Sequence, residues 1–434
     1  MKGLTGNILR TFSTQIPSII LSIISGIFLT RLLGVEGKGI QAIFYANMEI
    51  MVMLFAMGCD MGIIYFGSNK KISQGKLQAI AMYLLGVIIP LIAICILFFD
   101  VDFLFPNNYD GLFFKGFLIG IFSLTLINTL LGAFLKTAKS FKSVNRINLF
   151  NSVFNVITFI VMFYLNDKGI ITVSIKIIFF VRLVILSLNT LLWIISFFKV
   201  IELKPTFNIS FKDEIFPFFK YVFPIFISIV INFLNYRFDI WLVSYFKGNV
   251  QLGLYVLAAN FAQFILLYSR IIGSVMMPYL SENNTGQRKK YFVIYSRINF
   301  TSVALMVIVL AFVGDLLLVF LYGKEFASSA QPFNILLIGM VFTAMSQLFS
   351  IMLFSKGNNK VALIANSVGL VATILFDVLL IPKFGIEGAA IATTISYFLI
   401  FVVLLTYLLA KERVSFFELF LIKRKDFKTI FQED

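Results

Sequence analysis

The sequence predicts an all-α membrane protein with twelve transmembrane helices, arranged as two pseudo-symmetric six-helix lobes around a central cavity. Three observations predict this fold class: the composition, the spacing of the apolar runs and an internal repeat. Of the 434 residues, 60% are hydrophobic and 13% are charged, and the mean hydropathy is +0.96. A soluble domain is about 45–50% apolar and about 25% charged. The chain is therefore expected to fold in a lipid bilayer.

Polar clusters divide the sequence into twelve apolar runs, each close to the length of roughly 20 residues that a helix needs to cross a bilayer. The first run, Ile16–Leu33, has no small-residue cleavage pattern after it, so we expect it to stay as a membrane anchor. The expected spans are residues 12–33, 40–66, 77–99, 112–135, 147–165, 170–198, 217–245, 252–277, 298–321, 332–355, 361–382 and 386–410.

The distribution of basic residues predicts the topology. The chain carries 36 Lys and Arg against 21 Asp and Glu, a net charge of +15. If both termini are cytoplasmic, 25 basic residues fall on the cytoplasmic side, for example around 136–146, 288–297 and 411–428, and 8 fall on the outer side. Cytoplasmic loops of membrane proteins carry this excess. The charge is thus explained without a nucleic-acid partner.

An internal repeat predicts the two lobes. Asn151-Ser-Val recurs as Asn366-Ser-Val, and Gly169-Ile recurs as Gly385-Ile, each about half the chain length further on and at nearly the same offset. Because six helices return the chain to its starting side, the halves are expected to be parallel repeats with a cavity between them. The predicted organisation is an N-terminal lobe at 1–200, a cytoplasmic linker at 201–216, a C-terminal lobe at 217–411 and a basic cytoplasmic tail at 412–434.

Polar residues recur at helical spacing inside the apolar runs. Ser18, Ser22 and Ser25 share one face of the first span, and Asn232, Asn235 and Asp239 share one face of the seventh. Hydrogen bonds between packed helices can explain any single stripe. Stripes on at least seven spans favour a polar cavity, because a buried polar group without a partner costs several kcal/mol in lipid.

Ionisable residues inside the spans are the stronger functional candidates, because a charge at the bilayer centre costs at least about 2.5–3.5 kcal/mol. The planar guanidinium group stays charged and forms paired hydrogen bonds with phosphate. This favours an anionic, phosphate-bearing cargo. The candidate substrate-binding residues in the spans are Arg182, Arg237, Arg270, Asn232, Asn235 and Gln263, and the candidates for ion coupling are Glu49, Asp60, Asp239 and Asp377.

Two of these candidates compete for one helix face. Arg237 and Asp239 lie about 200° apart on a regular helix, so both can face the cavity only if the helix is rotated locally, for example at Pro224. Gln263 and Arg270 are expected to share a face of the eighth span, and Glu49 and Asp60 a face of the second. Glu49 lies nearest the middle of its span.

No pattern in the chain predicts catalysis or a bound cofactor. The sequence has no His, so it has no His-based relay, His-ligated metal or Ser-His pair, and it has no phosphate-binding G-x-x-x-x-G-K-[ST] loop. We therefore expect a protein that is not an enzyme, with no catalytic residues, no metal and no cofactor.

Four segments carry a resemblance to a known family. They are Arg31-Leu-Leu-Gly-Val-Glu-Gly-Lys-Gly39, Asn235-Tyr-Arg-Phe-Asp239, Gly253-Leu-Tyr-Val-Leu-Ala-Ala-Asn260 and Ile381-Pro-Lys-Phe-Gly-Ile-Glu-Gly-Ala-Ala-Ile-Ala-Thr393. In these segments the chain resembles the polysaccharide transporter family, the O-antigen and capsule repeat-unit flippases of the multidrug/oligosaccharidyl-lipid/polysaccharide exporter superfamily. The resemblance adds Arg31 to the substrate-binding candidates and marks Arg237 and Asp239 as family positions.

The resemblance implies a flippase of the bacterial inner membrane. Its cargo would be an undecaprenyl-pyrophosphate-linked oligosaccharide, whose anionic headgroup the cavity arginines hold while the lobes alternate between the two sides. The polyprenyl tail would stay among the membrane lipids. A polysaccharide polymerase and a ligase would then use the cargo for O-antigen (lipopolysaccharide) or capsule. A multidrug/cation antiporter of the same superfamily and a non-transporting polysaccharide-assembly protein are the alternatives.

Overall fold

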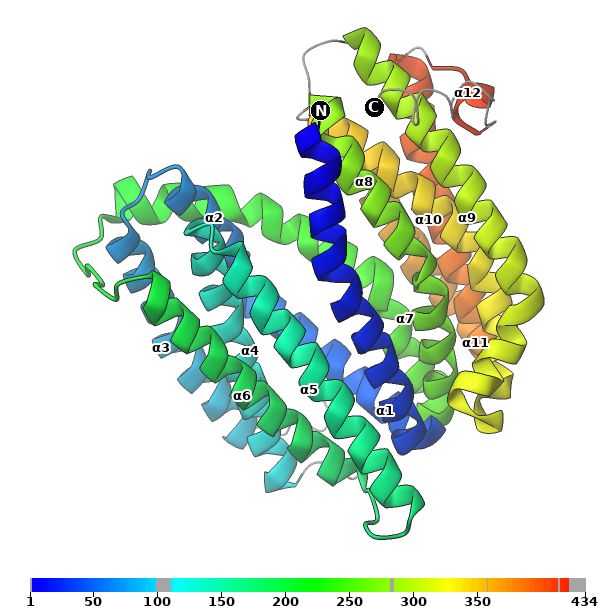
Figure 1. Ribbon diagram of the computed structural model, residues 1–434, viewed down its shortest axis with the longest axis horizontal. Helices are drawn as coiled ribbons and strands as arrows, with labels where there is room; N and C mark the ends of the chain where they lie inside the picture. Colours follow the sequence, from blue (N-terminus) through cyan, green and yellow to red (C-terminus); the bar gives the residue numbers. More distant parts are fainter. Residues whose placement is uncertain (1, 99–110, 282–284, 357, 413, 421–434) are drawn as a thin grey trace. The chain divides into compact units, whose positions relative to one another are not determined.

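The computed structural model describes residues 2–98, 111–281, 285–356, 358–412 and 414–420. Within these ranges every regular element is helical (Figure 1). The helices are α1 (Lys2–Ala56), α2 (Cys59–Ser68), α3 (Gln74–Phe98), α4 (Leu112–Thr137), α5 (Phe141–Asp167), α6 (Ile175–Val200), α7 (Phe216–Gln263), α8 (Ile265–Ser281), α9 (Thr285–Tyr322), α10 (Ala330–Ser355), α11 (Asn359–Glu412) and α12 (Phe416–Phe420), with a π-helical turn at Phe211–Ile215 and a 3₁₀ turn at Lys324–Ser329. Most of the predicted tail, residues 421–434, lies outside the described residues.

Twelve crossings account for the helix lengths. The described residues contain 9 helical stretches that are long and apolar enough to cross a membrane. Three of them, Pro17–Ala56, Phe211–Gly273 and Asn359–Lys411, have 40, 63 and 53 residues. At 1.5 Å per residue each is at least about twice as long as the roughly 30 Å hydrocarbon core is thick. Each of the three therefore supplies two crossings, which gives the twelve that the hydropathy pattern predicts.

A glycine turn divides each long stretch into its two crossings. Gly34 (φ 63°, ψ −174°), Gly248 (φ 78°, ψ 179°) and Gly385 (φ 63°, ψ −136°) interrupt α1, α7 and α11. Gly34 and Gly248 occupy a backbone region that is essentially restricted to glycine. They hold corresponding positions in the two halves of the chain, and Gly169, also at positive φ, corresponds in the same way to Gly385. The repeat seen in the sequence is thus present in the backbone.

The chain forms two compact units. The N-terminal unit comprises Thr11–Gly34 and Ile43–Val230, and the C-terminal unit comprises Met1–Arg10, Val35–Ala42 and Ile231–Asp434. The division falls inside α7. The residue bounds expected for the lobes, with a linker at 201–216, stay a prediction.

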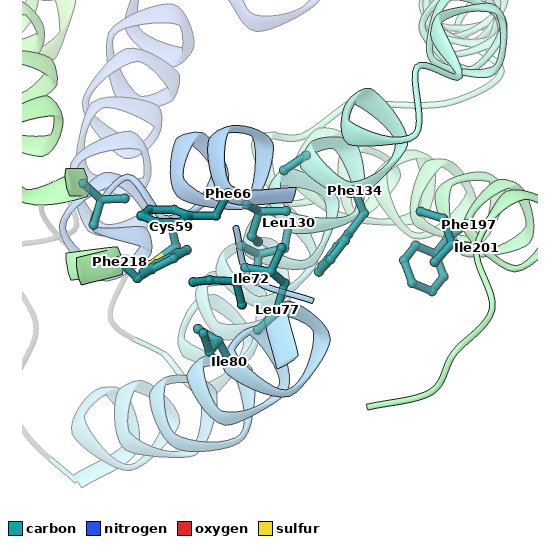
Figure 2. Close-up of a cluster of buried hydrophobic side chains, with 14 residues drawn as sticks. Cys59, Phe66, Ile72, Leu77, Ile80, Leu130, Phe134, Phe197, Ile201 and Phe218 are labelled. Atoms are coloured by element: carbon teal, nitrogen blue, oxygen red, sulfur yellow. The ribbon is translucent and has the colours of Figure 1, made fainter. Parts of the chain in front are cut away.

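Aromatic packing holds the core of the N-terminal unit. A buried cluster joins α2, α3, α4, α6 and the start of α7, where Phe66 and Phe218 lie beside Cys59 (Figure 2). The Phe66 and Phe218 rings are 5.6 Å apart. A Cβ atom on Gly62 would lie 2.5 Å from Cζ of Phe218, so only glycine lets these helices approach. Close packing of this kind replaces the hydrophobic effect as the main attraction between helices in lipid.

The C-terminal unit is built around α10, which packs on α8, α9 and α11 (Figure 1). Its buried residues include many polar side chains, such as Ser269, Asn299 and Asp377, each 0% exposed. The Ser269 hydroxyl donates to Asn299 Oδ1 at 2.9 Å. This polar interior holds the candidate site.

Candidate functional site

A pocket of about 340 Å³ lies within the C-terminal unit, between α7, α8, α10 and α11. This volume is at the lower end of the range of about 300–1,000 Å³ typical of small-molecule sites. Most of the lining residues carry an amide or a hydroxyl group. The lining residues are Asn232, Asn235, Tyr236, Arg270, Thr343, Ser346, Gln347, Ser350, Ile351, Phe354, Asn366, Tyr397 and Ile400.

Two features of the lining leave hydrogen-bonding capacity unused. Asn235 donates its amide to the backbone carbonyl of Asn366 at 2.8 Å, and its Oδ1 atom is buried without a donor among the described residues. Gln347 lies against the Tyr236 hydroxyl, but its Oε1 atom is likewise buried and has no donor in the described part of the chain. Buried polar atoms are nearly always paired in native proteins. The pocket therefore lies beside hydrogen-bonding capacity that the described residues leave unmet.

Arg270 is the charged residue of this lining, and it lies on α8. The part of the chain that the structure describes offers its guanidinium group no ion pair and no hydrogen bond. The side chain is exposed, and Tyr236 lies within range of its positive charge. The pocket thus combines one available positive charge with a neutral polar wall.

A second, much smaller cavity of about 10 Å³ lies in the same unit. A space of this size holds about one water molecule or one small ion. Arg237, Asp239, Tyr255, Gln263 and Thr393 are among its lining residues. Arg237 and Asp239 therefore meet at one cavity, although a regular helix would turn them apart.

Asp239 lines this second cavity, and the buried carboxyl group of Asp377 lies within electrostatic range of Asp239. Asp239 Oδ2 accepts hydrogen bonds from the Tyr255 hydroxyl and, at 3.5 Å, from the Thr393 hydroxyl. Asp239 Oδ1 and both oxygens of Asp377 are buried without a donor among the described residues, and the two carboxyl groups interact electrostatically. The described residues contain no group of three or more His, Cys, Asp or Glu side chains that would hold a metal. Two carboxylates with hydroxyl groups beside them suit a proton or one monovalent cation better than a divalent metal.

Arg182 occupies a polar patch of the N-terminal unit. Its guanidinium donates to Asn155 Oδ1 at 2.9 Å and lies 4.9 Å from the centre of the Phe159 ring. Asn155 in turn donates to the Asn151 side chain at 3.0 Å. The Nε atom of Arg182 is buried and has no acceptor among the described residues. The described residues therefore surround Arg182 with amide and aromatic groups and give it no ion pair.

The remaining candidates also lie in the N-terminal unit. Arg31 is exposed and stands three residues before the Gly34 turn. Glu49 is exposed, in contrast to the deep position that its place in the span suggested. Asp60 lies in the first turn of α2. A carboxylate there is stabilised by the helix dipole, so a structural role explains it.

Two expectations about shared helix faces are wrong because the helices break. Gln263 ends α7 and Arg270 lies in α8; the break at Phe264 sends them to different cavities. Glu49 and Asp60 are separated by the turn at Met57 and Gly58, both at positive φ. A helical phase calculated across such a break does not apply.

The structure adds site residues that the sequence analysis missed. Thr343, Ser346, Gln347 and Ser350 all line the large pocket from α10. Their spacing of three and four residues is that of one helix face, so this stripe was available in the sequence. Tyr255 and Thr393 were not singled out, because they meet Asp239 only in the folded unit.

Comparison with known families identifies the class of protein. The family model described as "Polysaccharide biosynthesis protein" matches residues 4–284, well over half of the chain, and a second model, MatE, matches residues 224–379. The chain belongs to the polysaccharide biosynthesis protein family and is a multi-pass membrane protein.

Individual relatives agree with this assignment. The chain is 24% identical over 278 residues to the capsular polysaccharide biosynthesis protein CapF of Staphylococcus aureus, covering 63% of this chain and 68% of CapF. It is 26% identical over 241 residues to the lipid II flippase MurJ of Bacillus subtilis, covering 51% of this chain and 43% of MurJ.

A solved structure of similar fold supports the architecture. The inward closed conformation of a lipid II flippase MurJ superposes with a TM-score of 0.70 and 18% identity, over 96% of this chain and 90% of that one. Such neighbours have a fold of twelve helices in two lobes. The predicted fold class is therefore confirmed.

Proposed function

We propose that the chain is a flippase that moves an undecaprenyl-pyrophosphate-linked oligosaccharide from the cytoplasmic to the outer leaflet of a bacterial inner membrane. The single observation that carries this proposal is Arg270, a cation unpaired among the described residues, in a polar pocket inside a unit made of apolar helices. The relatives that act in capsule synthesis and lipid II flipping support the same class of cargo. The product would feed a polymerase and a ligase that build O-antigen or capsule.

The physics of anion binding supports this role for the arginines. A guanidinium kept among apolar helices costs a few kcal/mol, so its retention without a carboxylate partner calls for an anionic ligand. Arg270 and the free Nε of Arg182 are the donors best suited to this in their respective units. Arg31 and Arg237 complete the proposed set of cargo-binding arginines, with Asn232, Asn235 and Gln263 as neutral contacts. No covalent step is needed, so the activity is transport and not catalysis.

Alternating exposure of the cargo site to the two sides is the proposed mechanism. The glycan and headgroup would leave the inner leaflet while the polyprenyl chain stays in lipid. With an inside-negative membrane potential, moving an anion outward releases about 2.3 kcal/mol per charge per 100 mV.

Ion coupling is proposed at Asp239 and Asp377. Their three unpaired carboxylate oxygens are out of contact with water, and such charges must be neutralised by a bound cation or by protons. A proton or one monovalent cation fits the cavity of about 10 Å³ beside Asp239. Glu49 and Asp60 remain weaker candidates, since neither is buried.

A multidrug or cation antiporter is the second candidate, and the match of the MatE model over residues 224–379 favours it. A pocket for cationic drugs needs a net negative or neutral lining. Among the described residues that line the large pocket, Arg270 is the charged one, and its positive charge repels a cationic drug. The charge of the pocket therefore supports the flippase.

A transport assay with reconstituted protein tests the proposal. Vesicles containing the purified chain and an undecaprenyl-pyrophosphate-linked oligosaccharide should expose the glycan on the opposite leaflet faster than protein-free vesicles. Arg270→Gln should slow this, and Arg146→Gln should not, because Arg146 is exposed on α5 outside the pocket. Export of cationic dyes without glycan transport would instead support the antiporter.

A further inference from the structure

We propose that the large pocket of the C-terminal unit binds an acidic sugar unit of the cargo, with the sugar carboxylate on Arg270 and the sugar hydroxyls on Gln347 and its neighbours. The inference rests on the proposed function, because it names the part of a glycan cargo that this pocket takes. It assigns Arg270 to a sugar-borne carboxylate and not to the diphosphate.

Charge matching favours a ligand group with a single negative charge. Arg270 alone supplies a full charge among the described residues that line the pocket. A carboxylate carries one negative charge and accepts two parallel hydrogen bonds from a guanidinium. A diphosphate carries more than one negative charge, and the single guanidinium group of this pocket would leave the excess uncompensated.

The wall of the pocket presents acceptors, which need a ligand with donors. The Thr343 hydroxyl donates to the Gly339 carbonyl at 3.1 Å, and the Ser346 hydroxyl donates to the Phe342 carbonyl at 2.8 Å. Their hydrogens are therefore committed to the helix, and their oxygens face a ligand as acceptors. Gln347 lines the pocket beside them, and its buried Oε1 atom has no donor among the described residues. Sugar hydroxyls donate to such groups, whereas ionised phosphate has no donor to offer.

The apolar part of the lining also suits a sugar ring. The Tyr236 and Tyr397 rings lie 5.7 Å apart, and Ile351, Phe354 and Ile400 complete the apolar surface. Tyrosine combines an apolar face with a polar tip. A pyranose has the same mixed character, with an apolar C–H face and a rim of hydroxyls. A pocket of about 340 Å³ has room for one such ring with its substituents.

Paired cargo lipids test the inference. Two undecaprenyl-pyrophosphate disaccharides that differ only in the distal sugar, glucuronate or glucose, are given to the reconstituted full-length protein. We expect the glucuronate lipid to reach half-maximal transport at a concentration about tenfold lower or more, the usual worth of a charge-assisted hydrogen bond. Arg270→Gln should remove this preference, so that the two lipids reach half-maximal transport at the same concentration.

Binding without transport gives a second readout. Methyl glucuronide should raise the melting temperature of the purified protein more than methyl glucoside or inorganic pyrophosphate does, because a ligand of the native state stabilises it. Arg270→Lys, which keeps the charge, should retain part of this difference. Arg146→Gln should behave as the unchanged protein does.

The outcomes separate this inference from the proposed function. Transport of neither lipid would overturn the flippase assignment and, with it, the inference. Equal transport of both lipids by the unchanged protein would overturn the acidic-sugar site and leave the flippase standing. An equal slowing of both lipids by Arg270→Gln, or stabilisation by pyrophosphate alone, would assign Arg270 to the diphosphate instead.

Discussion

Gly39 and Gly253, which hold corresponding positions in the two repeats, pack against each other backbone to backbone within the C-terminal unit. A Cβ atom on Gly39 would overlap the carbonyl oxygen of Asn249 and lie 3.0 Å from the Gly253 nitrogen. A Cβ atom on Gly253 would overlap the carbonyl oxygen of Val35 and lie 3.1 Å from the Gly39 nitrogen. The contact is reciprocal between two repeat-related segments of the chain.

Alanine at either position should therefore be severely destabilising. The obstacles are backbone carbonyls, which cannot swing aside as a flexible side chain can, and overpacking of a core typically costs about 1–3 kcal/mol or more. We expect Gly39→Ala and Gly253→Ala to lower the yield of monodisperse protein and its melting temperature. Gly86→Ala is the matched control, because nothing lies within 4 Å of its Cβ position. Full tolerance of alanine at Gly39 would contradict the close approach.

At Gly248 the cost of an unfavourable backbone conformation can be measured separately from the cost of a steric clash. Its Cβ position is empty to 4 Å, but its φ of 78° and ψ of 179° fall where essentially only glycine is found. Gly248→Ala should cost about 1–3 kcal/mol, and Gly248→Asn should give no rescue, because asparagine tolerates the left-handed helical region and not this one. Thermal unfolding in detergent would measure both. Gly116→Ala, in open space inside α4, is the comparison.

The sequence predicts the crossings better than it predicts the site. Long apolar runs are decided by the bilayer itself, so the twelve spans and the repeat around Gly34 and Gly248 follow from hydropathy and offset alone. The break at Phe264 does not follow, because neither glycine nor proline marks it. At this break the backbone forms i→i−3 hydrogen bonds, from Phe264 N to Phe261 O and from Leu267 N to Phe264 O.

Only some residues of the candidate site could be predicted from the sequence. Asn232, Asn235 and Arg270 were found as conspicuous polar residues in apolar spans, and they do line one pocket. Ser346 and Gln347 on α10 were overlooked, although their stripe is readable. The contacts of Asp239 with tyrosine and threonine hydroxyls join residues from different helices, and only tertiary packing brings them together.

Arg182 should contribute to the stability of the N-terminal unit as well as to cargo binding. Its hydrogen bond to Asn155 and its stacking on Phe159 use the planar guanidinium, which an ammonium group cannot reproduce. Arg182→Lys should therefore cost about 1–3 kcal/mol, close to the usual worth of a hydrogen bond to a charged group. Urea or thermal unfolding would measure this. Equal stability of Arg182→Lys and the unchanged protein would mean that the two contacts contribute nothing net.

Asp239 and Asp377 should govern the response of transport to an ion gradient. Replacing either by asparagine removes a carboxylate with unpaired buried oxygens while keeping its shape, so the fold should be retained or made more stable. In vesicles with an imposed proton or sodium gradient, the unchanged protein should respond to one of the two, and Asp239→Asn and Asp377→Asn should not. Asp315→Asn is the control, because Asp315 is exposed on α9 and receives a hydrogen bond from Asn334 at 3.1 Å, away from this cavity. A coupling role for the carboxyl pair would be contradicted if the unchanged protein responds to neither gradient, or if Asp239→Asn keeps the full response. The membrane potential acting on the anionic cargo would then be the driving force.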